Sequence, residues 1–275
     1  MLTGPPGCGK TLVARGIHTE MGNDNLIETN GETLNCKQEL YRTLIDADSK
    51  TTIFVDEAQV LDRTAQHILL TALSEGILRI PSRVYSVGSH PVRLDKFTMI
   101  LATTDEHLLQ NALRNRMRIY CRFDYYQVDD LVEIVRQRAD ALRWQYESDD
   151  VLMAIAQRAK CTPRLALHRN LYACWHVVVG RGSQMITLGD TEKAFRCLRI
   201  DGLGLEQNDR TYLELLLKHG PVPVGVLASR MMLPSLTVQR VIEPYLLKEE
   251  FITKDTSSRR AITEKGRRHM EGNSS

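Results

Sequence analysis

The sequence predicts an α/β protein in which a parallel sheet with crossover helices is followed by a helical block and a small C-terminal domain. Up to about residue 124, short β-branched runs alternate with helical stretches, as in parallel sheets joined by helices. Beyond that point, apolar residues follow helical spacing over most of the chain. We therefore expect three domains, at residues 1–124, 125–200 and 201–275.

Composition limits the class of protein. The chain has 275 residues, of which 43% are hydrophobic, so each domain can bury a core. The net charge is only +2, which does not by itself indicate a polyanion partner. No apolar run is long enough for a membrane span, and the first residues do not resemble a secretory signal. The six cysteines include no CxxC pair, which indicates reduced, individually buried thiols. We expect a cytoplasmic protein without membrane contact.

The first domain contains four runs that we expect to be strands of the sheet. A helix is expected at about 64–75. The segment 77–94 contains Pro81, Gly88 and Pro91, and it is expected to form a β-hairpin or a long loop. The four expected strands are 25–28, 51–55, 97–101 and 119–123.

The third domain has the element order of a winged helix. Helical patterns at 207–218, 222–231 and 235–247 precede two short runs at 251–254 and 260–263. Between residues 254 and 268 the chain carries six basic and two acidic residues, among them Lys254, Arg259 and Arg260. Such a concentration of charge is typical of a surface that binds phosphate backbones, although a solvated terminal face would look the same.

Residues 4–11, GPPGCGKT, match the pattern of a phosphate-binding loop. Gly4, Gly7 and Gly9 allow backbone N–H groups to turn toward phosphate oxygens without interference from a Cβ atom. Lys10 offers a positive charge to the β- and γ-phosphates, and Thr11 offers a hydroxyl to Mg²⁺. This motif predicts an NTPase.

Two further strand ends carry polar groups suited to the same site. Residues 53–57 form an apolar run that ends in Asp56, a candidate Mg²⁺ ligand, and Glu57, a candidate base for the attacking water. Thr104 follows the next long strand, and its hydroxyl is a candidate partner of the γ-phosphate or the water. Carboxyl ends of parallel strands share one edge of a sheet, so we expect these groups to meet. The alternative is that residues 53–57 are only a strand that enters a loop, with no catalytic role.

Three arginines are candidates for contacts to the phosphates. Arg114 and Arg116 precede the last expected strand, either as a solvated face or as fingers that reach the nucleotide of a neighbouring subunit. Arg164 follows Pro163 at a helix start, where a positive charge opposes the helix dipole unless an anion lies nearby.

Together these segments resemble the AAA+ ATPases, and specifically the RuvB family of Holliday-junction branch-migration motors. The resemblance covers nearly the whole chain and implies a RecA-like AAA+ core, an all-helical lid and a C-terminal winged-helix domain. It also implies ATP and Mg²⁺ as ligands, four-way junction or duplex DNA as a partner, and a hexameric ring. The matching segments are GPPGCGKT at 4–11, FVDEA at 54–58, FTMILATT at 97–104, LRNRMRI at 113–119, FDYYQVDDL at 123–131, TPR at 162–164, DGLGL at 201–205 and VIEPYLLKEEFI at 241–252.

The resemblance also assigns roles to single residues. Asp56 and Glu57 would be the Walker B pair, with Thr11 and Asp56 at the metal. Thr104 would be the first sensor and Arg164 the second. Arg116 would act in trans, with Arg114 beside it. The nucleotide would contact the loop together with Leu12 and Tyr126, and Lys254, Arg259 and Arg260 would touch DNA. Segment 77–94 would dock a RuvA-like junction-binding protein.

Several positions depart from the family pattern. Met117 stands where Phe is usual, and Ala58-Gln59 stand where Ile-His is common. Only Met1-Leu2-Thr3 precede Gly4, whereas the family has a preceding segment that helps to form the adenine pocket, so we expect weak nucleotide affinity. The alternatives are another DNA-linked AAA+ ATPase, of the clamp-loader or transposition-helper type, and an ATPase-impaired DNA-binding protein.

Overall fold

The computed structural model describes residues 1–81 and 89–272. Contacts divide the chain into two compact units, Met1–Tyr125 and Tyr126–Ser275, and each unit is described by itself. Within the described residues, no helix combines the length and the apolar character that crossing a membrane requires.

The first unit is built on a five-stranded parallel sheet with the strand order β2-β3-β6-β1-β7. The interior strand β3 is buried along nearly its whole length, which explains its apolar run at residues 53–55. Strand β1 comprises only two residues, but it pairs with β6 on one side and with β7 on the other. The strands are β1 (Leu2–Thr3), β2 (Asn25–Asn30), β3 (Thr51–Asp56), β6 (Thr98–Thr103) and β7 (Cys121–Arg122).

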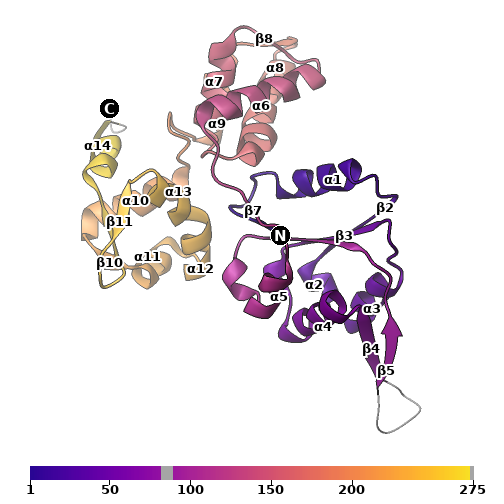
Figure 1. The fold of residues 1–275 in the computed structure, drawn as a ribbon. Coiled ribbons are helices and arrows are strands. Elements are labelled where there is room, and N and C mark those ends of the chain that lie inside the picture. The colour runs from indigo at the N-terminus through magenta and orange to yellow at the C-terminus, as the bar shows by residue number, and fades with distance from the viewer. Residues whose placement is uncertain (82–88, 273–275) are drawn as a thin grey trace. The chain divides into compact units, whose positions relative to one another are not determined.

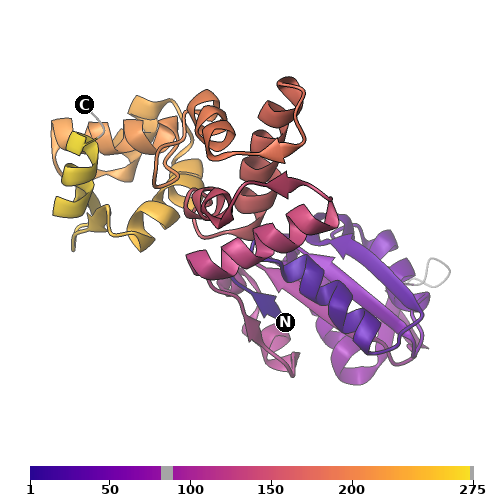
Figure 2. The ribbon, with the colours of Figure 1, turned by 90° about the horizontal axis from the view of Figure 1, so that it is seen from above.

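Helices cover both faces of this sheet (Figures 1 and 2). Helix α1 (Lys10–Glu20) lies on one face, and the remaining helices of the unit lie on the other. The second group comprises α2 (Gly31–Leu34), α3 (Lys37–Ile45), α4 (Arg63–Glu75) and α5 (Asn111–Arg116), with short 3₁₀ turns η1 (Ala58–Val60) and η2 (Glu106–Leu108). Helix α4 begins where the Asp62 carboxylate accepts a hydrogen bond from Ala65 N, and it ends at Gly76 with φ 65°.

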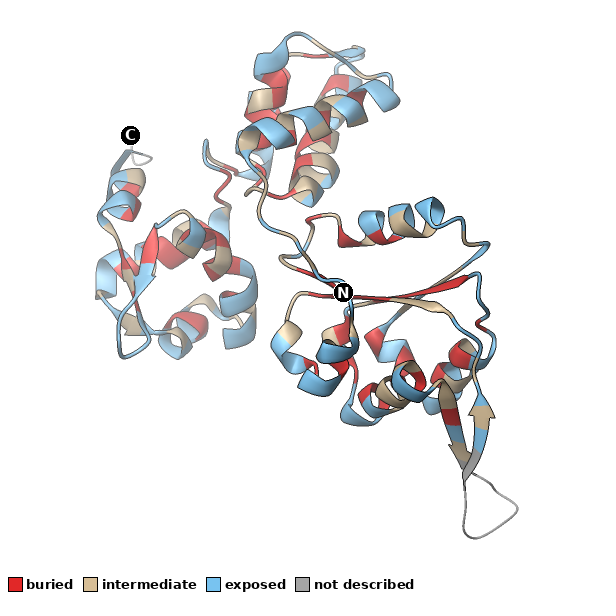
Figure 3. Cartoon of the chain, in the orientation of Figure 1, coloured by how far each residue is buried: buried red, intermediate tan, exposed pale blue. Residues whose placement is uncertain are grey.

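Alternation along the strands divides the core into two layers. Ile53, Val55 and Leu101 pack with α2 to α5, whereas Phe54 and Ile100 pack with the α1 side. Figure 3 shows that buried residues follow the sheet and the inner sides of the helices in this unit. The segment after α4 forms a hairpin from β4 (Ile77–Pro81) and β5 (Ser89–Arg93), as expected. Residues 82–88 of the segment, including Arg83, lie outside the described residues.

The first part of the second unit is a helical bundle with its own apolar core. It also contains a short parallel pair of strands, which the helical spacing did not predict. Pro163 is the first helical residue after Thr162, as expected. The elements are α6 (Val128–Ala141), β8 (Gln145–Tyr146), α7 (Asp149–Gln157), the π-helix η3 (Leu165–Leu171), α8 (Tyr172–Gly180), β9 (Met185–Ile186) and α9 (Leu188–Leu198).

The rest of the second unit is a winged helix, which confirms the order predicted from sequence. Its three-stranded antiparallel sheet has the order β10-β12-β11, and its helices enclose a separate core around Tyr212 and Leu246. The elements are α10 (Gln207–His219), β10 (Val222–Pro223), α11 (Val224–Met231), α12 (Ser235–Thr237), the π-helix η4 (Val238–Ile242), α13 (Glu243–Lys248), β11 (Ile252–Lys254), β12 (Arg259–Ile262) and α14 (Glu264–Gly272).

Ion pairs and a close backbone contact join the helical bundle to the winged helix. Lys160 Nζ lies 2.5 Å from Asp209 Oδ2, and Arg169 pairs with Glu206. Gly204 has φ 82°, and a Cβ atom there would lie 2.7 Å from the carbonyl oxygen of Arg158. The linker at 201–205 therefore packs so closely on the bundle that residue 204 must lack a side chain.

The cysteines are all free, but the expectation that each is buried was wrong. Cys8 and Cys174 are buried, whereas Cys36 and Cys197 are exposed. Both exposed thiols lie outside the apolar cores. The spacing of cysteines along the sequence carries no information on burial, so it could not separate these two from the buried ones.

Candidate functional site

The glycine-rich loop connects β1 to α1 at the carboxyl edge of the parallel sheet. Gly4, Gly7 and Gly9 have φ values of 144°, 79° and 92°, in a region that residues with side chains rarely adopt. A Cβ atom on Gly4 would also lie 2.3 Å from the carbonyl oxygen of Phe123. The loop conformation therefore depends on glycine, as the motif predicted.

The side chains of Lys10 and Thr11 lie on the first turn of α1, under the loop. Lys10 is buried, and its ammonium donates hydrogen bonds to the carbonyl oxygens of Gly4 (2.7 Å) and Pro5 (2.9 Å). Thr11 Oγ1 donates to Asp56 Oδ2 at 3.2 Å, so the loop and the end of β3 meet as expected. The ammonium is therefore held at the loop, where it would face a phosphate bound by the loop amides.

The Thr11–Asp56 pair fits a magnesium ion. Two neighbouring ligands of octahedral Mg²⁺ lie about 2.9 Å apart, given bonds of about 2.05 Å. The observed 3.2 Å is close to this spacing. No group of three or more His, Cys, Asp or Glu that could hold a metal occurs among the described residues. That is typical of Mg²⁺ sites that are completed by substrate phosphates and water.

Glu57 follows Asp56 in a strained backbone conformation, with φ 49° and ψ 44°. A backbone strained in this way persists only where the surrounding structure holds it, and such positions are frequent at functional sites. Part of that support is Gly31, where a Cβ atom would lie 2.6 Å from the carbonyl oxygen of Glu57. Gly31 was not among the predicted site residues, although it lies directly after the end of β2. The Glu57 side chain is exposed at the edge of the sheet, where a water molecule can reach it.

Thr104 lies directly after β6 and joins this group of side chains. Its hydroxyl accepts a hydrogen bond from Gln59 Nε2 at 3.2 Å, and the same amide also donates to the Glu57 carboxylate. The structure thus brings together Lys10, Thr11, Asp56, Glu57 and Thr104 at one edge, as predicted. Gln59 also belongs to the cluster, although its sequence position suggested only a departure from the family pattern.

Arg116 is exposed at the end of α5, and its guanidinium lies on the C-terminal end of α4. Arg116 Nε and Nη2 donate to the Leu73 carbonyl at 2.9 and 2.8 Å, and Nη2 also donates to Ser74 O at 3.2 Å. Carbonyls at a helix end attract a positive charge. Arg114 instead lies 3.6 Å from Glu106 and is half-buried. The two arginines therefore differ in accessibility.

The other predicted nucleotide contacts lie on different elements. Leu12 is 74% exposed and lines a shallow apolar groove of about 560 Å³ along α1, with Val13, Ile17 and Met21. Tyr126 and Arg164 belong to the second unit, where Tyr126 N donates to the Cys161 carbonyl at 3.0 Å. Arg164 is exposed. Their part in a nucleotide site stays a prediction.

The structure places Arg260 differently from the expectation of a DNA contact. Its side chain is buried, and Nε and Nη2 donate to the Glu243 carboxylate at 2.8 and 3.1 Å. A third bond joins Nη1 to Ser258 O at 2.7 Å. Tyr212 also donates to Glu243, at 3.1 Å. The Arg260 guanidinium is thus taken up inside the winged helix and does not present a free surface for phosphate.

Charge pairing shifts the ionisation of this cluster. Burial raises the pKa of Glu243, but hydrogen bonds from Arg260 and Lys254 outweigh it, so the net pKa lies below its usual value. The hydrogen bond to Glu243 raises the pKa of Arg260. Lys254 is exposed, with Nζ 3.2 Å from a Glu243 carboxylate oxygen, and Arg259 is exposed on β12. Of the three predicted DNA contacts, these two remain accessible.

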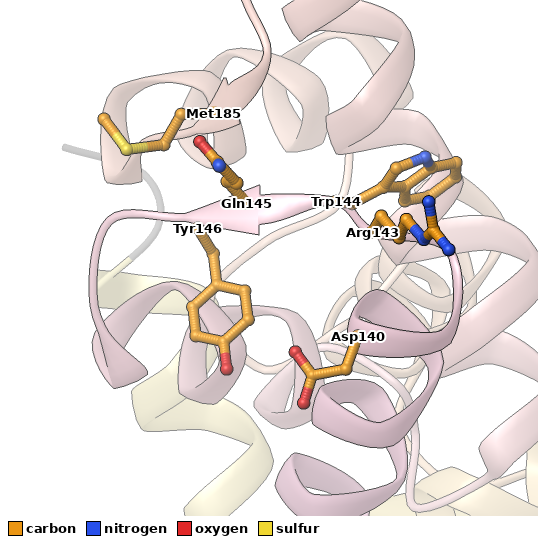
Figure 4. A pocket seen from close by; sticks show the side chains of 6 residues that line it. All are labelled: Asp140, Arg143, Trp144, Gln145, Tyr146 and Met185. Carbon is orange, nitrogen blue, oxygen red and sulfur yellow. The ribbon is translucent and has the colours of Figure 1, made fainter.

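A separate depression of about 510 Å³ lies in the helical bundle and contains none of the predicted site residues. Figure 4 shows its lining, with Asp140 from α6, Arg143 and Trp144 from the following turn, and Gln145 and Tyr146 from β8. Trp144 stacks on Trp175, with ring centroids 4.4 Å apart. This stacking accounts for the position of the Trp144 ring and gives the depression no chemical role.

Comparison with known families and proteins covers nearly the whole chain. A model of the Holliday junction DNA helicase RuvB P-loop domain matches residues 1–123, and a model of the RuvB C-terminal winged helix domain matches residues 202–271. The Holliday junction branch migration complex subunit RuvB of Fervidobacterium nodosum is 32% identical, over 98% of this chain and 78% of the relative. The corresponding subunit of Streptococcus uberis is 33% identical, over 98% of this chain and 81% of the relative.

Solved structures agree with the sequence matches. The Thermotoga maritima RuvB Holliday junction branch migration motor is 28% identical and aligns with a TM-score of 0.84, covering 98% of this chain and 86% of that chain. A variant of the same protein aligns with a TM-score of 0.86. The RecA-like AAA+ core and the winged helix predicted from sequence are thereby confirmed. Identity, coverage and fold lead to one conclusion: the chain belongs to the RuvB family.

Proposed function

We propose that this chain is an ATP-driven motor that moves Holliday junctions during recombination and repair. One observation carries the proposal: Thr11 and Asp56 lie 3.2 Å apart under a glycine-dependent loop, with Glu57 and Thr104 at the same sheet edge. These groups are what nucleotide hydrolysis requires. The winged-helix match separates this proposal from a clamp-loader or transposition-helper ATPase.

In the proposed reaction, backbone amides of the loop and Lys10 bind the β- and γ-phosphates of ATP. Thr11 and Asp56 would hold Mg²⁺, which supplies charge neutralisation to the phosphates. Glu57 orients the attacking water and accepts its proton, while Thr104 donates a hydrogen bond to the γ-phosphate. Leu12 and Tyr126 pack beside the nucleotide.

The arrangement of subunits completes the proposal. A hexameric ring would bring Arg116 of one subunit to the nucleotide of the next, with Arg114 supporting the same loop. ATP would draw Arg164 and the helical domain (125–200) toward the core (1–124), and hydrolysis would release them. Lys254 and Arg259 of the winged helix (201–275) would contact DNA phosphates, and Arg260 would hold the wing in shape. A RuvA-like protein would dock on segment 77–94.

The test is an assay of phosphate release and junction unwinding, with and without four-way junction DNA. Lys10→Ala should lose ATP binding, because the phosphates lose their main counter-charge. The Glu57→Gln variant should bind ATP but should not hydrolyse it. If the unaltered protein neither binds ATP nor cleaves it, the proposal is wrong, and a DNA-binding role without hydrolysis becomes the better account.

A further inference from the structure

The side chain of Gln59 connects two strand ends of the candidate site. Gln59 lies in the 3₁₀ turn η1, just after β3, and it is half-buried. Its Nε2 donates to the Glu57 carboxylate and, at 3.2 Å, to Thr104 Oγ1. Its Oε1 accepts a hydrogen bond from Thr103 Oγ1 at 2.7 Å and a longer one from Thr104 N at 3.4 Å. One amide group therefore contacts both Glu57 and the end of β6.

The chemistry of the partners fixes the orientation of this amide. The backbone N–H of Thr104 can only donate, so the atom facing it must be the amide oxygen. An ionised carboxylate can only accept, so the atom facing Glu57 must be the NH₂ group. Because that group has two hydrogens, it can serve Glu57 and Thr104 together.

The backbone of Glu57 is held by its surroundings, whereas the position of its side chain depends on the hydrogen bond from Gln59. Glu57 itself is held in the left-handed region, and Gly31 packs against its carbonyl oxygen. Within the described part of the chain, Gln59 is the one residue with a hydrogen bond to the Glu57 carboxylate. The position of the carboxylate is thus set by an amide that is itself anchored on Thr103.

We propose that Gln59 is a positioning residue for hydrolysis, which holds the Glu57 carboxylate and makes its position follow the end of β6. This inference rests on the proposed ATPase function. When Thr104 engages a phosphate, the shift of the strand end reaches Glu57 through the Gln59 amide. Gln59 would not touch ATP, so it should affect turnover and leave binding unchanged.

The first measurement is steady-state hydrolysis by Gln59→Leu, which keeps a similar volume but removes every hydrogen bond. The turnover number should fall by about tenfold or more, the usual effect of losing a hydrogen bond to a charged group. The KM and the dissociation constant for ATP should stay within about twofold. Gln66→Leu is the matched control: Gln66 is buried in the same unit and bonds Leu61 O and Gln110 N, which lie outside the cluster. It should lower stability without lowering the turnover number of the folded protein.

The second measurement is the turnover number of Gln59→Glu. The introduced group keeps oxygen atoms for Thr103 and Thr104, but as a carboxylate it repels Glu57 and donates no hydrogen bond. Its turnover number should fall at least as far as that of Gln59→Leu, while the dissociation constant for ATP should stay within about twofold. A merely structural role for Gln59 would not separate turnover from binding in this way.

The outcomes separate this inference from the proposed function. If Glu57→Gln abolishes hydrolysis while Gln59→Leu keeps the normal turnover number, the Gln59 inference is wrong and the ATPase proposal stands. The same holds if Gln59→Leu and Gln66→Leu lower turnover equally. If Gln59→Leu does not fold, the turnover number and ATP affinity of Gln59→Glu decide. If the unaltered protein has no hydrolysis, the ATPase proposal itself fails.

Discussion

Arg260 and Glu243 form a bidentate ion pair inside the winged helix, with nitrogen–oxygen distances of 2.8 and 3.1 Å. Glu243 is 1% exposed and Arg260 is 6% exposed. A pair so deeply buried is costly to break from one side, because the remaining charge loses its partner but stays out of water. The neighbouring Arg259 faces outward on the same strand.

Arg260→Ala should therefore destabilise the second unit by about 3 kcal/mol, the lower end of the range for a broken buried pair, because Lys254 stays beside Glu243. Urea denaturation measures this. Arg259→Ala is the matched control and should change stability by less than about 0.5 kcal/mol. It should instead reduce the slope of log affinity for DNA against log salt by about 0.9. Equal stabilities of the two variants would contradict the assignment of Arg260.

Glu243 should also give the unit an acid-sensitive component of stability. Its folded pKa lies below the unfolded value of about 4.3, so its contribution is complete above that pH and disappears as pH falls through the folded pKa. Glu243→Gln should be less stable than the unaltered protein at pH 7, and the difference should shrink below about pH 4.3. Denaturation at a series of pH values tests this, and a difference that stays constant into acid would refute it.

Gly4→Ala should disrupt the phosphate loop. The new Cβ atom would lie 2.3 Å from Phe123 O in a backbone with φ 144°. We expect a loss of more than about 2 kcal/mol of stability, together with weaker ATP binding. Gly16→Ala, on α1, meets nothing within 4 Å and should gain up to about 1 kcal/mol from helix propensity. Thermal unfolding and ATP titration of both variants measure the contrast.

Arg116→Ala should bind ATP but lose hydrolysis by about a thousandfold in the assembled protein, if the guanidinium acts on the neighbouring subunit. A mixture with Glu57→Gln subunits provides the decisive measurement. Each variant alone should be inactive, and mixing should restore part of the activity at sites that combine an intact Glu57 with an intact neighbouring Arg116. No recovery in mixed rings would refute action in trans.

Much of the candidate site could be predicted from one loop motif and from strand ends. Lys10 belongs to the phosphate-loop motif, whereas Asp56 and Thr104 stand at the ends of apolar runs, which parallel pairing brings to one edge. The sheet order could not be predicted, because β1 and β7 have only two residues each and carry little pattern. Gln59 was missed as a site residue since its partners come from two strand ends that only the folded sheet brings together.

The position of Arg260 shows a signal that was available in the sequence. Side chains alternate along a strand, so Arg260 must share a face with Ile262, two residues later. Because Ile262 is buried, that face is the inner one. The prediction that Arg260 contacts DNA rested on the local concentration of basic residues and on the family resemblance, and neither takes account of this alternation.

The joint between the bundle and the winged helix decides where the protein can be divided. A cut between residues 200 and 201 would remove Lys160 from Asp209, whose carboxylate is 3% exposed. It would also remove the backbone on which Gly204 rests. An isolated C-terminal fragment would then carry an acid without its counter-ion at a freshly uncovered surface, so deletion experiments on DNA binding should retain residues 126–275 as one piece.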